Sequence, residues 1–504
     1  MQSDGRAAGL LVAGTSSDAG KSLVATGLCR LLARRGVSVA PFKAQNMSNN
    51  SMVCIDGAEI GRAQYLQAQA AGVEATSAMN PVLLKPGSDR RAHVVVRGRP
   101  AGNLEAGDYA TGRAHLAEAA YAAFEELAGR FEMIVCEGAG SPAEINLREG
   151  DYVNAGLARR FGLPMVVVGD IDRGGVFAAL YGTHALLDEA DQKLITCFVI
   201  NKFRGDPDVL APGLDELTRR TGIPVAGVLP WLEGIWLDGE DTLQVGTWAR
   251  SKRNTVSIPG GTPPEPPGAT AALSVAVVRL PRVSNLTDAD AVAAEPGVEV
   301  RVTADPALLS EADLVVLPGS RSTVADLDWL RDQGLDRVLV DRAHRGAAVL
   351  GICGGYQMLG STIRDELESG RGLSSGLGLL PIQVVFDRDK ELGRPSGTWR
   401  GHHVLAYEIH HGIADLDGDV EPFLDGCRVG SVWGTMWHGT LENDEFRRAW
   451  LSEVAASAGS AWRPEPGAPA YAARRETMIN TLADAMEDHL DLDLLLTGTR
   501  PGRP

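Results

Sequence analysis

The chain has 504 residues and a formal net charge of −17. Apolar residues make up 44% of it and charged residues 22%, which is the balance of a folded globular protein and excludes a disordered chain. The length allows two or three domains, each with its own hydrophobic core. The negative charge disfavours nonspecific binding to nucleic acid, although local basic residues can still bind an anionic substrate.

No apolar segment approaches the roughly 20 residues that span a bilayer, so we predict no membrane association. The apolar run near the N-terminus is too short for a signal-peptide core and predicts a first buried strand instead. The cysteines lack CxxC spacing, which predicts neither a disulfide framework nor a zinc site. We therefore expect a cytoplasmic protein. The six cysteines are Cys29, Cys54, Cys136, Cys197, Cys353 and Cys427.

Residues 1–245 are predicted to form a first α/β domain. Apolar runs alternate with helix-length segments such as residues 22–36, and several runs are apolar throughout, as in strands buried on both faces. This β-α-β order indicates a doubly wound parallel sheet. The predicted strands are residues 10–14, 37–43, 131–138, 163–170 and 194–202.

Residues 246–272 are rich in Pro, Gly, Ser and Thr, which is typical of a linker between domains. A second doubly wound α/β domain is predicted over residues 273–454. Beyond it, residues 455–504 comprise an Ala/Gly/Pro-rich segment and an amphipathic helix at 474–496. The strands predicted for the second domain are residues 273–281, 298–303, 312–319, 347–353 and 376–386.

The first predicted strand leads into GTSSDAGKS, a glycine-rich turn followed by a helix. This context predicts a P-loop, in which backbone N–H groups and the helix N-terminus bind phosphate. A lysine would neutralise phosphate charge and a serine hydroxyl would bind Mg²⁺. The turn has one residue more than the usual GxxxxGK[ST], which indicates a variant subfamily. The residues predicted to bind phosphate are Gly14, Thr15, Gly20, Lys21 and Ser22.

Polar residues also follow other predicted strands of the first domain, where ligands bind in such folds. Glu137 is a candidate Mg²⁺ ligand or a turn carboxylate, and Asn201 either contacts a nucleotide base or stabilises a turn. Lys43 is placed to meet phosphate or carboxylate. Lys85 and Arg90 belong to a basic cluster that either binds an anion or forms a solvated surface.

In the second domain, a predicted strand leads into GICGGYQMLG. A nucleophile between glycines on a strand-to-helix turn is exposed, and the helix N-terminus favours the thiolate of Cys353. His438 is the candidate base, with His410 and His411 as competitors. Gly319 and Gly354 are candidates for backbone N–H donors to an oxyanion.

The motifs LPGSRST, GICGGYQMLG and GTMWHGTLEND resemble the class I glutamine amidotransferase domain, which has a flavodoxin-like fold. GTSSDAGKS, PFKAQNMS, MNPVLLKP and CEGAGSPAEINL resemble dethiobiotin-synthetase-like ATP domains. Their order, together with PFKAQNMSNN and YEIHHG, resembles the cobyric acid synthase family of cobalamin biosynthesis. The resemblance extends to about residue 450.

This resemblance implies that Cys353 attacks glutamine and releases ammonia, with His438 as base and then acid. ATP would phosphorylate the b, d, e and g carboxylates of adenosylcobyrinic acid a,c-diamide, and ammonia would displace phosphate to form amides. The resemblance also makes Glu144 and Asp151 candidates for positioning substrate or water, although each is equally suited to capping a helix. The implied partners are glutamine and a corrinoid, with ATP and Mg²⁺ as cofactors and cobalt present only within the corrinoid.

The sequence departs from the usual amidotransferase triad, in which the histidine is followed two positions later by glutamate. Thr440 occupies that position here, and Glu442 lies four residues after His438. Glu442 is therefore predicted either to orient the histidine through a different geometry or to contribute little. The sequence does not give the oligomeric state, although related ATP domains form dimers, which makes a homodimer one candidate. The alternatives are a cobyrinic acid a,c-diamide synthase or related amidase, and a P-loop regulatory ATPase with an inactive glutaminase-like domain.

Overall fold

The computed structural model describes residues 7–87, 91–105, 114–235, 255–257 and 273–499. The chain divides into two units. Unit 1 contains residues 1–47, 54–238 and 475–504, and unit 2 contains residues 48–53 and 239–474. In the described part of the chain, no helix is both long and apolar enough to cross a membrane. Most of the predicted linker 246–272 lies outside the described residues.

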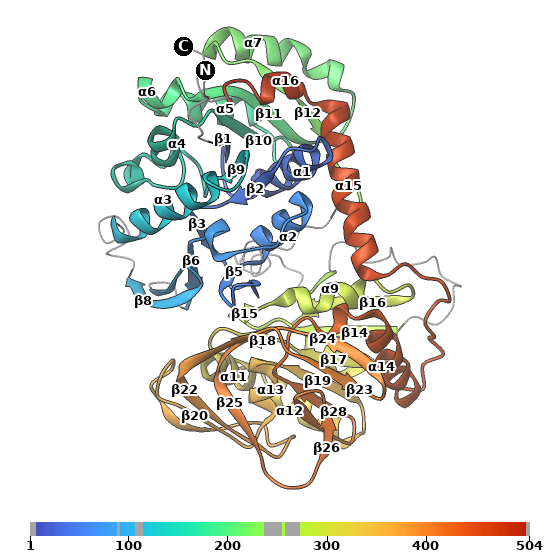
Figure 1. The fold of residues 1–504 in the computed structure, drawn as a ribbon. Helices are drawn as coiled ribbons and strands as arrows, with labels where there is room; N and C mark the ends of the chain where they lie inside the picture. The colour runs from blue at the N-terminus through green and yellow to red at the C-terminus, as the bar shows by residue number, and fades with distance from the viewer. Residues whose placement is uncertain (1–6, 88–90, 106–113, 236–254, 258–272, 500–504) are drawn as a thin grey trace. The chain divides into compact units, whose positions relative to one another are not determined.

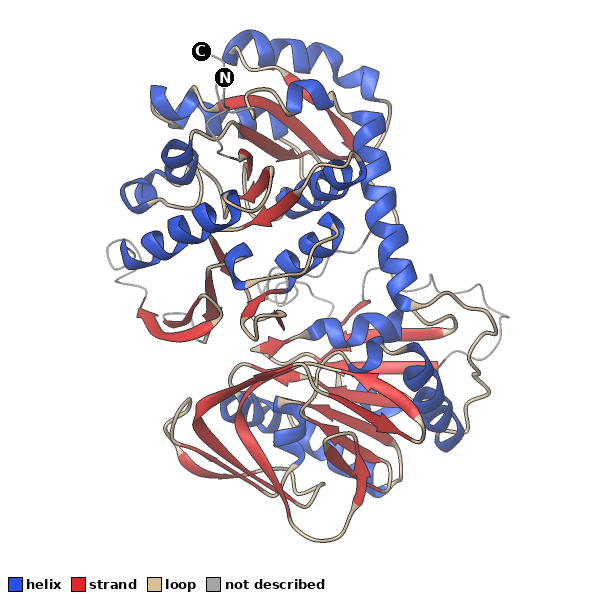
Figure 2. Cartoon of the chain, viewed as in Figure 1, coloured by secondary structure: helices blue, strands red, loops and turns tan. Residues whose placement is uncertain are grey.

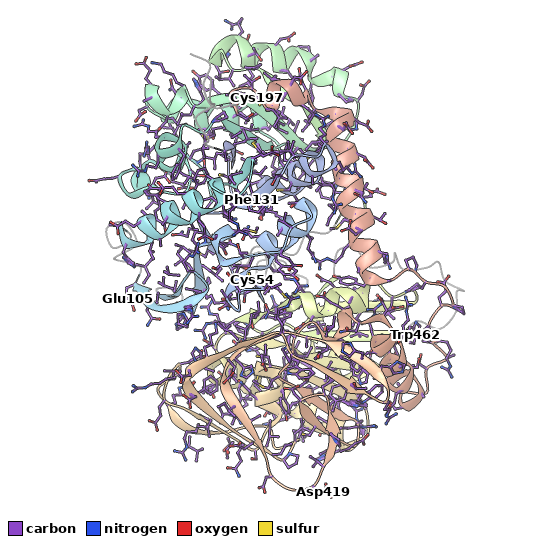
Figure 3. The ribbon with its side chains drawn as sticks, viewed as in Figure 1. Cys54, Glu105, Phe131, Cys197, Asp419 and Trp462 are labelled. Carbon is purple, nitrogen blue, oxygen red and sulfur yellow. The ribbon has the colours of Figure 1, made fainter. Side chains whose placement is uncertain are left out.

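Unit 1 is built on a six-stranded sheet in which every neighbouring pair is parallel (Figure 1). The five strands predicted for this domain are all present in it, and the sixth, β12, was not predicted. Cys197 of β11 is labelled in Figure 3. In spatial order, the strands are β12 (Val225–Pro230), β11 (Ile195–Phe203), β10 (Met165–Asp170), β1 (Ala8–Gly14), β9 (Met133–Glu137) and β2 (Val39–Phe42).

Helices cover both faces of this sheet (Figure 2). The alternation of side chains along β10 shows why its sequence is apolar throughout. Met165 and Val167 pack in the core on one face, and Val166 and Val168 pack in the core on the other. The first core includes α3 (Ala114–Ala128), α4 (Ala155–Phe161), α5 (Val176–Leu186) and α7 (Ala211–Thr221), and the second includes α1 (Lys21–Arg34), α2 (Arg62–Ala71), α15 (Tyr471–His489) and α16 (Leu492–Leu495).

The end of the chain forms two helices where residues 474–496 were predicted to form one. The backbone leaves the helix at Leu490, which forms a β-bridge with Gly227 of β12. Asp491 then caps α16 by accepting a hydrogen bond from the Leu494 backbone N–H. Pairing with the edge of the sheet and a new N-cap therefore interrupt the amphipathic pattern.

Unit 1 also contains a smaller four-stranded sheet, which ends at Glu105, labelled in Figure 3. Its strands are β3 (Gln45–Met47), β6 (Val82–Pro86), β7 (Arg91–Val96) and β8 (Arg99–Glu105).

Unit 2 is built on an eight-stranded sheet with parallel strands at its centre and antiparallel strands at both edges. The central strands follow the flavodoxin-like order 2-1-3-4-5, which confirms the predicted fold class. In spatial order, the strands are β13 (Thr255–Ser257), β16 (Val298–Thr303), β14 (Leu273–Val278), β17 (Leu314–Leu317), β19 (Ala348–Ile352), β28 (Val432–Thr435), β27 (Gly426–Val429) and β26 (Glu421–Phe423).

The last strand predicted for this domain, residues 376–386, was placed in the wrong sheet. It begins later, as β22 (Ile382–Gly393), and Ile382 and Val384 are buried whereas Gln383 and Val385 are exposed. Such alternation fits a sheet with one solvated face. The separate sheet consists of β21 (Gly372–Ser375), β20 (Thr362–Asp365), β22 and β25 (Glu408–Leu416), and β28 is the last parallel strand of the main sheet.

Candidate active sites

The candidate site of unit 2 lies where four parallel strands end. The chain leaves β14 toward Asp288, β17 toward Gly319, β19 toward Cys353 and β28 toward His438. These strands are consecutive neighbours in the sheet. Because parallel strands end at the same edge, side chains far apart in the sequence meet there.

Cys353 occupies a strained turn between β19 and α13 (Gly354–Leu359). Its φ of 49° and ψ of −109° are unusual for a residue with a side chain, and its N–H donates to the Thr435 carbonyl at 2.8 Å. Glycine is required on both sides of Cys353 because a side chain there would clash with neighbouring residues. A Cβ on Gly355 would lie 1.9 Å from the Leu317 carbonyl oxygen, and one on Gly351 would lie 2.8 Å from the Tyr356 nitrogen.

The thiol of Cys353 lies next to the imidazole of His438, close enough for each group to shift the pKa of the other. Burial opposes ionisation of the thiol, but the His438 charge and hydrogen bond, aided by the Gly354 N–H, lower the pKa of Cys353 below its ordinary value. Burial also opposes protonation of His438, yet Asp288 and Cys353 raise its pKa to about 10. The geometry therefore favours a thiolate–imidazolium pair over two neutral groups.

Asp288 orients His438 and was missed in the sequence. His438 Nδ1 lies 2.6 Å from Asp288 Oδ2, and the Gly439 N–H donates to Asp288 Oδ1 at 2.8 Å. Both side chains are buried. This bond leaves Nε2 of the imidazole for the thiol, an arrangement in which the acid fixes the tautomer and stabilises the imidazolium.

The orienting position predicted for Glu442 is thus filled by another residue. Glu442 lies in a short 3₁₀ turn, Thr440–Glu442, where its N–H bonds to the Gly439 carbonyl. The turn starts at Gly439, whose φ of 71° changes the direction of the chain directly after His438. We correct the assignment of Glu442 as the orienting acid, because Asp288 already occupies Nδ1.

We expect the Glu442→Gln variant to keep glutaminase activity within about threefold of wild type. Removing a carboxylate that does not hold His438 should change neither its tautomer nor its charge. Steady-state release of glutamate from glutamine measures this. A loss of several hundredfold would show that Glu442 takes part in the triad after all.

The two predicted oxyanion glycines lie next to the catalytic pair. The Gly354 N–H lies close enough to the Cys353 thiol to lower the pKa of that thiol. A Cβ on Gly319 would be 3.0 Å from His438 Cε1, and one on Gly354 would be 2.7 Å from the Ser320 nitrogen. These close approaches require glycine at both positions and fit the predicted role of their backbone N–H groups.

We expect alkylation of Cys353 by iodoacetamide to reach its plateau below the pH at which an ordinary thiol, with a pKa of about 8.5, ionises. The lowered pKa keeps the thiolate present as pH falls, and activity should decline only when the thiolate is protonated. The rate of labelling, located by peptide mapping, measures this. A rate that still rises tenfold per pH unit up to pH 9 would contradict the ion pair.

The candidate site of unit 1 is centred on the turn between β1 and α1. Gly20 has a φ of 104°, and a Cβ there would lie 1.9 Å from Asn201 Nδ2. Thr15 N–H donates to the Val168 carbonyl at 2.9 Å, and Lys21 Nζ donates to the Ser16 carbonyl at 2.9 Å. A Cβ on Gly14 would lie 2.9 Å from Lys21 Cγ, so the lysine folds back across the turn.

The end of β11 holds this turn in place. Asn201 Nδ2 donates to the Ala19 carbonyl at 3.1 Å. Lys202 Nζ donates to the Asp18 carbonyl at 2.6 Å and pairs with Asp170 Oδ2 at 2.8 Å. The amide of Asn201 thus supports the turn, and its predicted contact with a nucleotide base stays a prediction.

Glu137, at the end of β9, contacts the other polar side chains of this site. Its Oε1 accepts from Ser22 Oγ at 2.8 Å and lies 3.0 Å from Lys43 Nζ, and its Oε2 accepts from Gln67 Nε2 at 2.6 Å. Glu137, Lys43 and Gln67 are buried. A hydroxyl and a carboxylate at this separation suit Mg²⁺, which prefers oxygen ligands and takes the rest from water and phosphates.

The other predicted substrate residues do not join this group. Lys85 forms a buried ion pair with Glu59, and Glu144 is exposed. Asp151 accepts hydrogen bonds from the N–H groups of Val153, Asn154 and Gly156. This is the helix-capping role that the sequence offered as the alternative to positioning substrate or water. Arg90 lies outside the described residues.

Together, the fold and the two sites define a glutamine amidotransferase unit joined to a P-loop nucleotide-binding unit. The profile of the CobB/CobQ-like glutamine amidotransferase domain matches residues 274–446, and that of the CobQ/CobB/MinD/ParA nucleotide binding domain matches residues 10–243. Both matches agree with the positions of the two sites.

Relatives match along nearly the whole chain. A protein named cobyric acid synthase from Cutibacterium acnes is 61% identical over 97% of this chain and 99% of its own. Proteins of the same name from Streptomyces avermitilis and Mycolicibacterium gilvum are each 55% identical over 98% of this chain and 97% of their own. The chain belongs to the cobyric acid synthase family.

Proposed function

We propose that this protein uses ATP and glutamine to convert carboxylates of a corrinoid into amides. The observation that carries the proposal is the presence, in one chain, of a Cys353–His438–Asp288 triad and a P-loop with its serine on Glu137. The first arrangement suits release of ammonia from glutamine, and the second suits phosphoryl transfer. Family membership supports the corrinoid as the acid that is activated.

In unit 2, the thiolate of Cys353 attacks Cδ of glutamine. The His438 imidazolium gives its proton to the nitrogen as the C–N bond breaks, and ammonia leaves a γ-glutamyl thioester. Neutral His438 then takes a proton from water, which attacks the thioester and regenerates the thiolate. Asp288 keeps Nε2 directed at the sulfur in both steps, and the N–H groups of Gly319 and Gly354 are the proposed donors to the oxyanion.

In unit 1, an oxygen of the substrate carboxylate takes the γ-phosphoryl group of ATP, giving an acyl phosphate and ADP. Ammonia adds to the acyl carbon, the C–O bond to phosphate breaks, and a proton is lost as the amide forms. Phosphorylation is needed because oxide is a poor leaving group. Lys21 and Lys43 would neutralise phosphate charge, and Ser22 and Glu137 would hold Mg²⁺, which supplies further charge stabilisation.

The finer assignments rest on the family resemblance. They are amidation at the b, d, e and g side chains of adenosylcobyrinic acid a,c-diamide, a homodimer and a cytoplasmic location. The a,c-diamide synthase alternative shares both sites, so substrate tests separate it. A regulatory ATPase with an inactive second unit is disfavoured by the presence of Cys353, His438 and Asp288 at one site, with Asp288 on His438 Nδ1.

Transfer of oxygen from substrate to phosphate tests the proposed activation. The corrinoid, labelled with ¹⁸O in its free carboxyl groups, is incubated with MgATP and glutamine, and the inorganic phosphate is examined by mass spectrometry. One ¹⁸O atom per amide formed is expected, because the carboxylate oxygen leaves with phosphate. Amide formation without label in the phosphate would exclude the acyl phosphate.

A further inference from the structure

The glutaminase site contains a second histidine, His410, that the triad does not use. Its side chain is only 9% exposed, and neither ring nitrogen has a hydrogen-bond partner among the described residues. The Glu408 carboxylate and the Gly412 backbone lie near the ring, but neither meets hydrogen-bond geometry with it. A buried imidazole whose nitrogens make no hydrogen bond within the described residues is costly, so its position calls for a ligand.

The chain on either side of His410 is held against the catalytic residues. Before His410, Tyr407 and His438 exchange backbone hydrogen bonds of 3.1 and 2.8 Å. After His410, a Cβ on Gly412 would lie 2.5 Å from the side-chain Nε2 of Gln357. The backbone N–H of Gln357 in turn donates to the Cys353 carbonyl at 2.9 Å. His410 therefore lies close to the thiol, and the charges of His410 and Cys353 shift each other's pKa.

A carboxylate accompanies this imidazole. Glu408 and His410 are two positions apart on β25, so they share a face of the sheet. Glu408 Oε2 lies 3.5 Å from His410 Nε2, and a quarter of the Glu408 side chain remains exposed. A carboxylate, which suits a cation, and an imidazole, which suits an anion when protonated, thus lie side by side near the nucleophile.

This pairing complements the charged end of an α-amino acid, which carries an ammonium and a carboxylate on one carbon. We propose that His410 binds the α-carboxylate of glutamine and Glu408 binds its α-ammonium group. The inference rests on the proposed glutaminase function and adds to it the residues that select an α-amino acid. Because the contacts are remote from the scissile bond, they act on affinity for glutamine more than on the intrinsic reactivity of the thiolate.

Two reagents that modify the same sulfur separate these effects. 6-Diazo-5-oxo-L-norleucine carries the α-amino acid end of glutamine and forms a thioether with loss of N₂, whereas iodoacetamide lacks that end. Saturable inactivation by the first and alkylation by the second are measured on the full-length chain for wild type, His410→Gln and Glu408→Gln. His411→Gln is the matched control, because His411 Nδ1 bonds instead to the Asp387 carbonyl at 3.1 Å.

For His410→Gln and Glu408→Gln, the half-saturating concentration of the diazo reagent should rise about 10- to 100-fold, as expected for a lost charge-assisted hydrogen bond. Alkylation by iodoacetamide, compared at its high-pH plateau where the thiol is ionised in every variant, should stay within about threefold of wild type, and His411→Gln should match wild type with both reagents. Unchanged saturation in His410→Gln, or an equal loss with both reagents, would overturn the proposal. If wild type itself shows no saturable inactivation and no glutamine hydrolysis, the proposed glutaminase function fails instead.

Discussion

Replacing Asp288 with asparagine is expected to lower glutamine-dependent amidation by about 10³- to 10⁴-fold, the scale of losing the orienting acid in a hydrolytic triad. Asp288 accepts two hydrogen bonds, one from Gly439 and one from His438 Nδ1. Asparagine has only one side-chain oxygen, so if that oxygen keeps the Gly439 N–H, its NH₂ group faces Nδ1. The imidazole proton would then move to Nε2, which could no longer accept the proton of Cys353.

The variant should also shift the pH profile of Cys353. The Asp288 charge raises the pKa of His438, and the imidazolium lowers that of the thiol. Loss of this charge should therefore move alkylation of Cys353 to higher pH, by about one to three units. Amidation with ammonia should be unaffected, which reports on the integrity of unit 1. Glutamine-dependent activity within threefold of wild type would show that Asp288 does not orient His438.

Replacing Glu137 with glutamine is expected to lower amidation by at least about 100-fold with either glutamine or ammonia as nitrogen source. The carboxylate accepts from Ser22 and Gln67 and pairs with buried Lys43. Glutamine keeps the size but removes the charge that would hold Mg²⁺ and that pairs with the buried Lys43. Product formation under saturating MgATP measures the effect.

Glutaminase activity in the same preparation is the control for this variant, since Cys353 and His438 belong to unit 2. It should remain at the level measured for wild type. Two results would contradict the role given to Glu137. One is amidation near the wild-type rate, and the other is a defect that ammonia corrects.

The sequence predicted the parallel sheets well, because buried strands are apolar along their whole length. Strands β1, β2, β9, β10 and β11 all lie within or close to the predicted ranges. The predictions were less accurate where packing decides the partner. β22 has an apolar start but one solvated face, and the C-terminal helix ends where its backbone pairs with the edge of the main sheet.

For the glutaminase site, the local motifs were sufficient to propose Cys353 and His438 but not Asp288. The thiol and the imidazole each lie in a recognisable run, whereas Asp288 is 150 residues before its partner. The available signal was its position shortly after the first strand of the second domain, since the loops that follow parallel strands meet at one edge. Glu442 was predicted because it is close to His438 in the sequence. The turn at Gly439 changes the direction of the chain directly after His438, so this closeness in sequence was misleading.

The central claim is that two coupled sites amidate a corrinoid, and mass spectrometry of the corrinoid tests it most directly. Adenosylcobyrinic acid a,c-diamide is incubated with MgATP and either glutamine or ammonia, with wild type and Cys353→Ala compared. The account predicts successive carboxyl-to-amide changes with wild type, and in the variant their loss with glutamine but recovery with ammonia. No mass change with either nitrogen source would contradict the corrinoid assignment, and full glutamine-dependent activity in Cys353→Ala would contradict the glutaminase mechanism.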